Sequence, residues 1–196
     1  IVGQFFESAV LTAGKDVQAT YLLNCQLKAN GKLLVEGRKG VIIGGKTCAK
    51  LGVSCNGIGN IAEIATVVSV GIDKEDMTAY QELQKKIEQT QAELQTCENG
   101  LNKLMANPVH DEKVSMMIQR LTRAVYTLKS SRKELFSERN AQMEQMTKQK
   151  EARIQVSGRA YPGTLLFLNE DPFAIKEIYN NVEFVKHDNR IDTLAH

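Results

Sequence analysis

Short runs of alternating apolar and polar residues, separated by glycine, asparagine or lysine, fill residues 1–73. An apolar position at Leu11 recurs sixteen residues later as Leu27, and a further sixteen residues lead to Ile43. A small residue follows each of them two positions later: Ala13, Ala29 and Gly45. Alternation with a period of two is typical of half-buried strands, and a unit this short can bury its apolar face only against neighbouring units. The repeat therefore predicts a parallel β-helix solenoid, with an antiparallel β-sandwich of evenly spaced strands as the alternative.

The pattern changes to heptads between residues 74 and 151. Apolar positions advance by three and four residues from Tyr80 to Leu104, and the same spacing resumes after the helix breaker Asn107-Pro108. Such spacing forms the seam of a coiled coil. We expect an antiparallel coiled-coil hairpin whose arms each reach about 45–60 Å. The hairpin could serve as a spacer, a dimerisation arm or a docking rod. It could equally be an insertion without a partner, since its thirteen basic and twelve acidic residues balance and its flanks need no other protein.

Strand-like alternation returns in residues 152–196, where turns such as Tyr161-Pro162-Gly163 separate the apolar runs. This piece alone has too little apolar surface to fold independently. We expect it to pack on or extend the solenoid. The predicted domains are therefore a β-helix solenoid over 1–73, a helical coiled-coil hairpin over 74–151, and return β-strands over 152–196 that complete the β domain.

Composition supports these boundaries and narrows the function classes. Eleven of the 14 glycines fall in residues 1–73, whereas charged residues make up 12 of those 73 positions and 25 of the 78 in the middle segment. The net charge of +2 does not indicate a nucleic-acid binder. No apolar run is long enough to predict a transmembrane segment. Because the chain starts at Ile1 without a methionine, we expect it to be part of a longer protein.

Cysteine and histidine spacing predicts no metal site, no catalytic centre and no cofactor. The four cysteines form no C-x-x-C pair and lie far from any histidine. The three histidines, His110, His187 and His196, belong to no recognisable catalytic grouping. A chain of this length does not need disulfides, so we expect reduced thiols and a cytoplasmic protein.

The sequence disfavours two classes of enzyme. The run from Gly40 to Gly45-Lys46-Thr47 matches the spacing of a phosphate-binding P-loop. The following residues reach Gly52 and β-branched residues too soon for the helix that a P-loop requires. A β-helix acyltransferase would show six-residue repeats and a histidine at a coil edge, and residues 1–73 contain no histidine. The expectation is a protein without enzymatic activity.

Basic residues dominate one stretch of the predicted solenoid and are the candidate partner-binding residues. Only one acidic residue, Glu36, accompanies them. The six are Lys28, Lys32, Arg38, Lys39, Lys46 and Lys50. If they point outward on successive coils, they form a basic stripe that suits an acidic protein, with ordinary solvated surface as the alternative. No aromatic residues interleave with them, which disfavours a platform for single-stranded nucleic acid.

Three stretches of the sequence resemble corresponding segments of one known bacterial protein family. The first runs from Gly31 to Gly45 and ends in a double glycine, as the family's glycine-rich strand does. The second, Ile58-Gly59-Asn60 followed by residues 66–71, is similar to the family's segment before the helices. The third runs from Val156 through the Tyr161-Pro162-Gly163 turn after them. With the coiled coil, the similarity spans almost the whole chain. The chain thus resembles the flagellar assembly protein A family, a bacterial group.

The resemblance implies a right-handed β-helix core, a helical hairpin, and a role in protein assembly or localisation without catalytic residues. We expect a scaffold that acts through protein partners in flagellar assembly or polar organisation. It is also expected to self-associate through the coiled coil or through the strand edges at the solenoid ends. A generic polymer-forming or adaptor module unrelated to motility is the alternative.

Overall fold

The computed structural model describes residues 1–106, 111–188 and 190–195, which form two compact units. One unit comprises Ile1–Lys74 with Gln145–His196, and the other comprises Glu75–Glu144. The helix breaker Asn107-Pro108 and the two histidines His110 and His196 lie outside the described residues.

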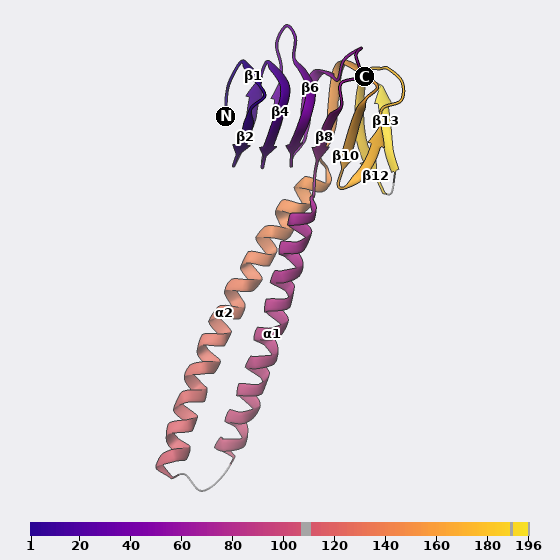
Figure 1. Cartoon of the computed structure of the whole chain (residues 1–196). Coiled ribbons are helices and arrows are strands. Elements are labelled where there is room, and N and C mark those ends of the chain that lie inside the picture. The colour runs from indigo at the N-terminus through magenta and orange to yellow at the C-terminus, as the bar shows by residue number, and fades with distance from the viewer. Residues whose placement is uncertain (107–110, 189, 196) are drawn as a thin grey trace. The chain divides into compact units, whose positions relative to one another are not determined.

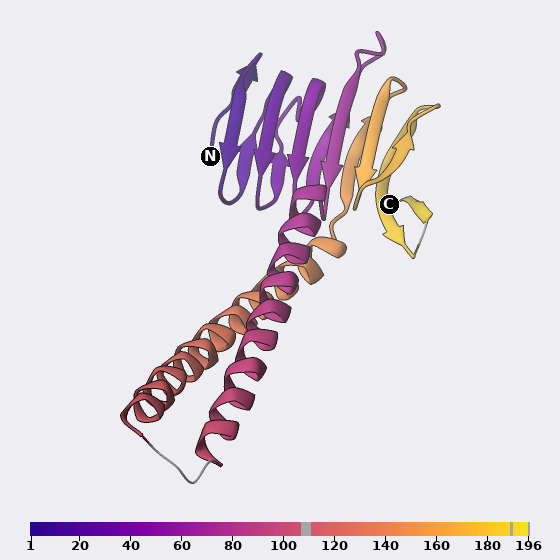
Figure 2. The same cartoon turned by 60° about the horizontal axis from the view of Figure 1, so that its bottom comes forward.

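The first unit is a β-solenoid, shown in Figures 1 and 2, whose two stacks of strands are joined where residues 41 and 42 of β6 pair in parallel with residues 57 and 58 of β7. In the first stack, β1 and β2 both pair in parallel with β4, followed by β6, β8 and β10. In the second stack, β3, β5, β7 and β9 pair in parallel. The first-stack strands are β1 (Phe5–Glu7), β2 (Val10–Ala13), β4 (Tyr21–Ala29), β6 (Val41–Ala49), β8 (Thr66–Val70) and β10 (Thr164–Leu168). Those of the second stack are β3 (Val17–Ala19), β5 (Leu33–Val35), β7 (Val53–Ile58) and β9 (Ile154–Ala160). The parallel solenoid predicted from the repeat is confirmed.

Side chains at the same level of successive coils stack to form the core. In the first stack Leu27 pairs with Leu11 on one side and with Thr47 on the other. The same row continues through Val68 and Leu166. A matching row in the second stack runs through Val17, Leu33, Val53, Ile154 and Phe184. Apart from Leu11, which is half-buried at the first coil, every member of the two rows is at most 3% exposed, so one hydrophobic interior joins all coils.

The prediction that Ile43 stacks in the same row as Leu11 and Leu27 is wrong. Ile43 pairs with Leu23, and Gly45 pairs with Cys25, so neither extends the row of Leu11 and Leu27. The first coil repeats after sixteen residues, but the second repeats after twenty, as the pairs Leu27 with Leu11 and Thr47 with Leu27 show. The four additional residues lie in the loop 36–40, which lengthens one corner and shifts everything after it.

The helical hairpin interrupts the solenoid between β8 and β9. It consists of α1 (Lys74–Met105) and α2 (Glu112–Lys150), which run side by side in both views (Figures 1 and 2). Acidic Glu75 and Asp76 lie in the first turn of α1, where the helix dipole favours negative charge. Arg132 of α2 donates to the Gln91 side chain of α1 over 2.8 Å, and Lys129 pairs with Glu98 at the same distance. The predicted inserted hairpin is confirmed.

The C-terminal strands resume and then close the stack. β10 lies in parallel register beside β8, although the hairpin separates them in sequence. Antiparallel strands then cover this end of the solenoid: β11 on β10, β12 on β9, and β13 on β12. They are β11 (Asp171–Ala174), β12 (Tyr179–His187) and β13 (Arg190–Ala195). The residues after the hairpin therefore both extend the solenoid and cap it.

Candidate protein-interaction surfaces

The P-loop spacing does not form a P-loop. Lys46 and Thr47 lie inside the single strand β6, and β7 and β8 follow before the first helix begins at Lys74. The Thr47 side chain points into the core, where it is fully buried. In the part of the chain that the structure describes, no helix therefore begins beside Gly45 to bind a phosphate. Among the described residues, no group of three or more histidine, cysteine or acidic side chains could hold a metal ion.

The four cysteines are free thiols, and Cys55 is a core residue. Its side chain points into the second stack, 3% exposed, with Sγ 3.7 Å from the Gln155 carbonyl oxygen. Burial raises the pKa of Cys55 from its ordinary 9.0 to about 12, partly offset by a hydrogen bond from the backbone of Gly57. At neutral pH this thiol stays protonated and is a poor nucleophile.

The six predicted partner-binding residues do not form one stripe. Lys46 lies on the outer side of β6, and Lys32 lies at the start of the second stack, just before β5. Arg38 and Lys39 belong to the loop before β6, whereas Lys28 and Lys50 lie near the opposite ends of the first-stack strands. The twenty-residue second coil and the two-stack arrangement disperse them. Their role in binding a partner stays a prediction.

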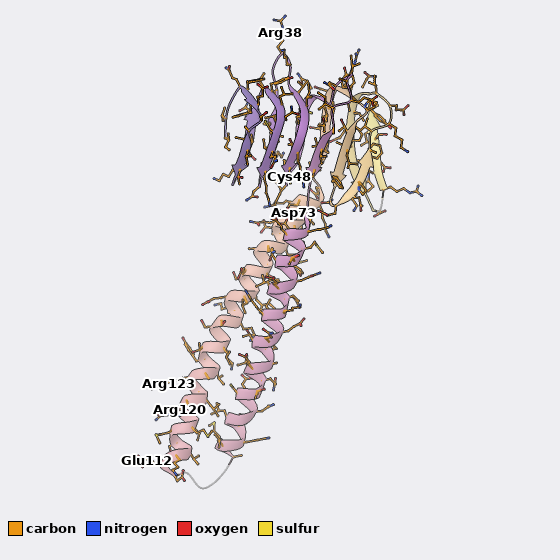
Figure 3. All side chains as sticks on the ribbon, in the orientation of Figure 1. Arg38, Cys48, Asp73, Glu112, Arg120 and Arg123 are labelled. Carbon is orange, nitrogen blue, oxygen red and sulfur yellow. The ribbon has the colours of Figure 1, made fainter. Side chains whose placement is uncertain are left out.

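The loop 36–40 carries two cations, and one of them, Lys39, lies beside an aromatic pair. Figure 3 shows Arg38 at the tip of this loop, at the end of the β unit away from Asp73. Lys39 Nζ lies 5.7 Å from the centroid of the Tyr21 ring. That ring stacks on Phe5 with centroids 5.1 Å apart and 12° between planes, and Phe5 is 55% exposed. Aromatic and arginine side chains such as Phe5, Tyr21 and Arg38 are enriched at protein interfaces.

Sequence reasoning missed this aromatic contact. Phe5 and Tyr21 are sixteen residues apart, as Leu11 and Leu27 are, and this spacing already predicts that they stack on neighbouring coils. Tyr21 lies 18 residues before Lys39, outside the basic stretch, so the sequence shows no aromatic residue among the basic ones. The fold brings Lys39 and Tyr21 together because the loop 36–40 leads into Val41, which pairs with Tyr21 at the start of β4.

At the other end of the same strands, two lysines share one carboxylate. Asp73 Oδ2 lies 3.9 Å from Nζ of both Lys28 and Lys50. Asp73 immediately precedes α1, and its side chain is 22% exposed. These two lysines therefore have a structural partner at the start of the hairpin, and of the six they are the least suited to recruit an acidic protein.

A shallow hollow of about 550 Å³ lies on the outer side of the second stack. Lys32, Lys148 and Arg153 contribute cations to its lining, and Glu151 contributes a carboxylate. Arg153 is already engaged, because its guanidinium donates to Glu183 over 3.1 Å. The hollow brings Lys32 together with residues more than a hundred positions later, which sequence reasoning did not foresee.

The length and composition of the two described helices decide whether either could span a membrane. Neither α1 nor α2 has the combination of length and apolar character that crossing a bilayer requires.

The fold and its exposed surfaces define a class of protein: a β-solenoid with a helical hairpin inserted between two of its coils. Within that class, this chain belongs to the flagellar assembly protein A β-solenoid domain family, whose match spans residues 1–191. The predicted family resemblance is confirmed over nearly the whole chain. No curated protein and no solved structure is a significant match to it.

Proposed function

We propose that this chain is a non-enzymatic scaffold that acts through contacts with other proteins in bacterial flagellar assembly or polar organisation, in the cytoplasm. The observation that carries the proposal is the family match over residues 1–191. The family name supplies the flagellar process. The mode of action is inferred from the surfaces described above.

The proposed mechanism is geometric. Stacked coils hold outward side chains at fixed spacings of about 4.8 Å, so a partner meets a rigid row of positions. The loop carrying Arg38 and Lys39, with the Phe5–Tyr21 stack beside it, is the surface best suited to an acidic protein partner. Aromatic anchors flanked by cations supply most of the binding energy in many interfaces.

The test uses the native bacterium. Deleting the gene is expected to reduce or misplace flagella, and the full gene is expected to restore them. A variant with Arg38→Ala and Lys39→Ala should fold but restore flagella poorly, whereas Lys15→Ala, an exposed lysine in a turn, should restore them fully. Normal flagella in the deletion strain would refute the flagellar assignment.

A second candidate is a polymer-forming or adaptor module unrelated to motility. The observation in its favour is the edge formed by β1 and β2, where Phe5 and Val10 are 55% and 77% exposed. An open strand edge with apolar side chains is a template for pairing with another chain. Filaments or stacked particles in electron micrographs of the purified protein, together with normal flagella in the deletion strain, would favour this candidate.

A further inference from the structure

A shallow hollow of about 430 Å³ lies on the surface of the helical hairpin, near the start of α2. Met116 and Met117, two of its lining residues, are 50% and 57% exposed. The full lining is Lys113, Met116, Met117, Arg120, Leu121 and Ala124, which we call the methionine face. Figure 3 shows Arg120 on this part of α2, close to Glu112 at the helix start. Exposed apolar side chains gathered in one hollow mark a contact surface, and methionine adapts readily to a packed partner.

The seam behind the methionine face is incompletely covered. In α1 between Lys74 and Leu94, the seam residues Leu83, Ile87 and Leu94 are buried. In the other half of the hairpin, described seam residues are only partly buried: Leu101, Leu104, Val114, Ile118, Leu121 and Val125. Two helices enclose their seam less completely than the four helices of a bundle do. Additional helices on this face would complete the burial.

Charge along the same face changes sign with distance from the hollow. Glu138 follows Arg120 by 18 residues, which is five full helical turns and about 27 Å, so both lie on one face of α2. On α1, Gly100 lies on the same side of the hairpin as the hollow. A Cβ built at Gly100 would lie 3.7 Å from Cδ1 of Leu121, which lines the hollow. Glu82 precedes Gly100 by 18 residues and so lies on that side too.

The two acidic residues lie near the same level of the hairpin. The contacts of Arg132 with Gln91 and of Lys129 with Glu98 set the alignment of the helices. When that alignment is continued along the hairpin, Glu138 of α2 and Glu82 of α1 are separated by about one helical turn along the hairpin axis. The face therefore presents the cations Lys113 and Arg120 at one end. At the other end it presents the carboxylates of Glu82 and Glu138, with Lys86 one turn from Glu82.

We propose that two copies of the hairpin pair antiparallel through the methionine face, so that Arg120 of each copy lies against Glu82 and Glu138 of the other. The arrangement is self-complementary, as a two-fold dimer requires, and each charge contact occurs twice. It also places Met116 and Met117 against helix surface of the second copy and covers the partly buried seam. This inference deepens the proposed function and rests on its premise that the chain acts through protein contacts.

The test measures self-association of the full chain by analytical ultracentrifugation. The wild type is expected to form dimers, and Arg120→Glu is expected to weaken the dimer about tenfold or more, because like charges then oppose each other. Combining Arg120→Glu with Glu82→Arg and Glu138→Arg should restore the dimer. The matched control is Lys133→Glu, which reverses an exposed charge thirteen residues from Arg120, on the far side of α2, and should leave the dimer unchanged.

Three results would overturn the proposal, each read on variants whose circular dichroism matches the wild type. The first is a wild-type chain that stays monomeric up to its solubility limit. The second is an equal loss of dimer in Arg120→Glu and Lys133→Glu. The third is a charge-swapped triple variant that stays as weak as Arg120→Glu alone. None of these results bears on whether flagella form in the deletion strain, so the two proposals fail separately.

Discussion

Asn169 Oδ1 accepts a hydrogen bond from the Ile72 backbone N–H over 2.9 Å, across 97 residues of sequence. The Nδ2 of the same side chain donates to the Lys150 carbonyl oxygen over 3.2 Å. Ile72 lies just before α1, and Lys150 is the last residue of α2. One asparagine in the coil after the insertion therefore binds both ends of the inserted hairpin to the solenoid.

Replacing Asn169 by alanine should lower the free energy of unfolding by about 1–2 kcal/mol, because the Ile72 N–H loses its acceptor in a partly buried position. Urea unfolding measures the loss, and hydrogen exchange should show the Ile72 amide less protected. Asn180→Ala is the control, since this exposed asparagine lies in β12 away from the junction. Equal stability of the two variants would contradict the role assigned to Asn169.

Gly71 makes room for that asparagine. Its φ is +88°, and a Cβ there would overlap Asn169 Oδ1 and lie 3.1 Å from the Gln149 carbonyl oxygen. Gly71→Ala should therefore cost about 2 kcal/mol or more, from backbone strain and the clash together. Gly14→Ala is the matched control, because nothing lies within 4 Å of a Cβ at Gly14, and it should be neutral in thermal or urea unfolding. A harmless Gly71→Ala would show that the junction is less closely packed than described.

Thr47 is a polar residue in an apolar row. Its Oγ1 is buried and has no hydrogen-bond partner among the described residues. Thr47→Val, of nearly the same shape, should raise the free energy of unfolding by about 1 kcal/mol.

Thr66 gives the opposite expectation and serves as the control. Its Oγ1 accepts from the Gly44 N–H over 2.9 Å and donates to the Ile64 carbonyl oxygen over 2.8 Å. Thr66→Val should therefore destabilise the chain in the same urea assay. A destabilised Thr47→Val would indicate that Oγ1 of Thr47 has a partner in solution.

Because the pKa of Cys55 is raised in the folded chain, the free energy of unfolding varies with pH in the alkaline range. Well below pH 9.0 the thiol is protonated in both the folded and the unfolded chain, so the benefit of its burial is fully present. As the pH rises from 9.0 towards 12, only the unfolded chain ionises, and stability falls by about 1.4 kcal/mol per pH unit. The stability advantage of the wild type over Cys55→Ala should therefore shrink between about pH 8 and about pH 10. An advantage that is constant over this range would show that Cys55 ionises normally in the folded chain.

Local repeats in the sequence predicted the class of fold because equal spacing implies stacking. The sixteen-residue spacing was sufficient for Leu11 and Leu27, which pair as expected. It was insufficient for Ile43, because nothing in the strand pattern distinguishes the longer corner at 36–40 from a regular turn. A solenoid tolerates such a change since only the strands, and not the corners, must keep register.

The interaction surfaces were harder to predict because they depend on which coils become neighbours. Lys28 and Lys50 are 22 residues apart in sequence, yet they meet the same carboxylate at Asp73. The contact of Lys39 with Tyr21 likewise depends on the corner length that the repeat did not reveal. Apart from the seam residue Leu121, the methionine face consists of heptad flank positions, and its hollow depends on the packing of the two helices.

The central structural claim is that the hairpin interrupts one continuous solenoid, and the contact between Val68 and Leu166 tests it most directly. These residues precede and follow the insertion, pair in parallel register and are fully buried. A methyl-resolved NOE spectrum of the full chain should show a strong cross-peak between them, because in-register residues on neighbouring strands lie about 5 Å apart. A spectrum in which Leu166 contacts the methyl groups of other core residues but not those of Val68 would contradict the account.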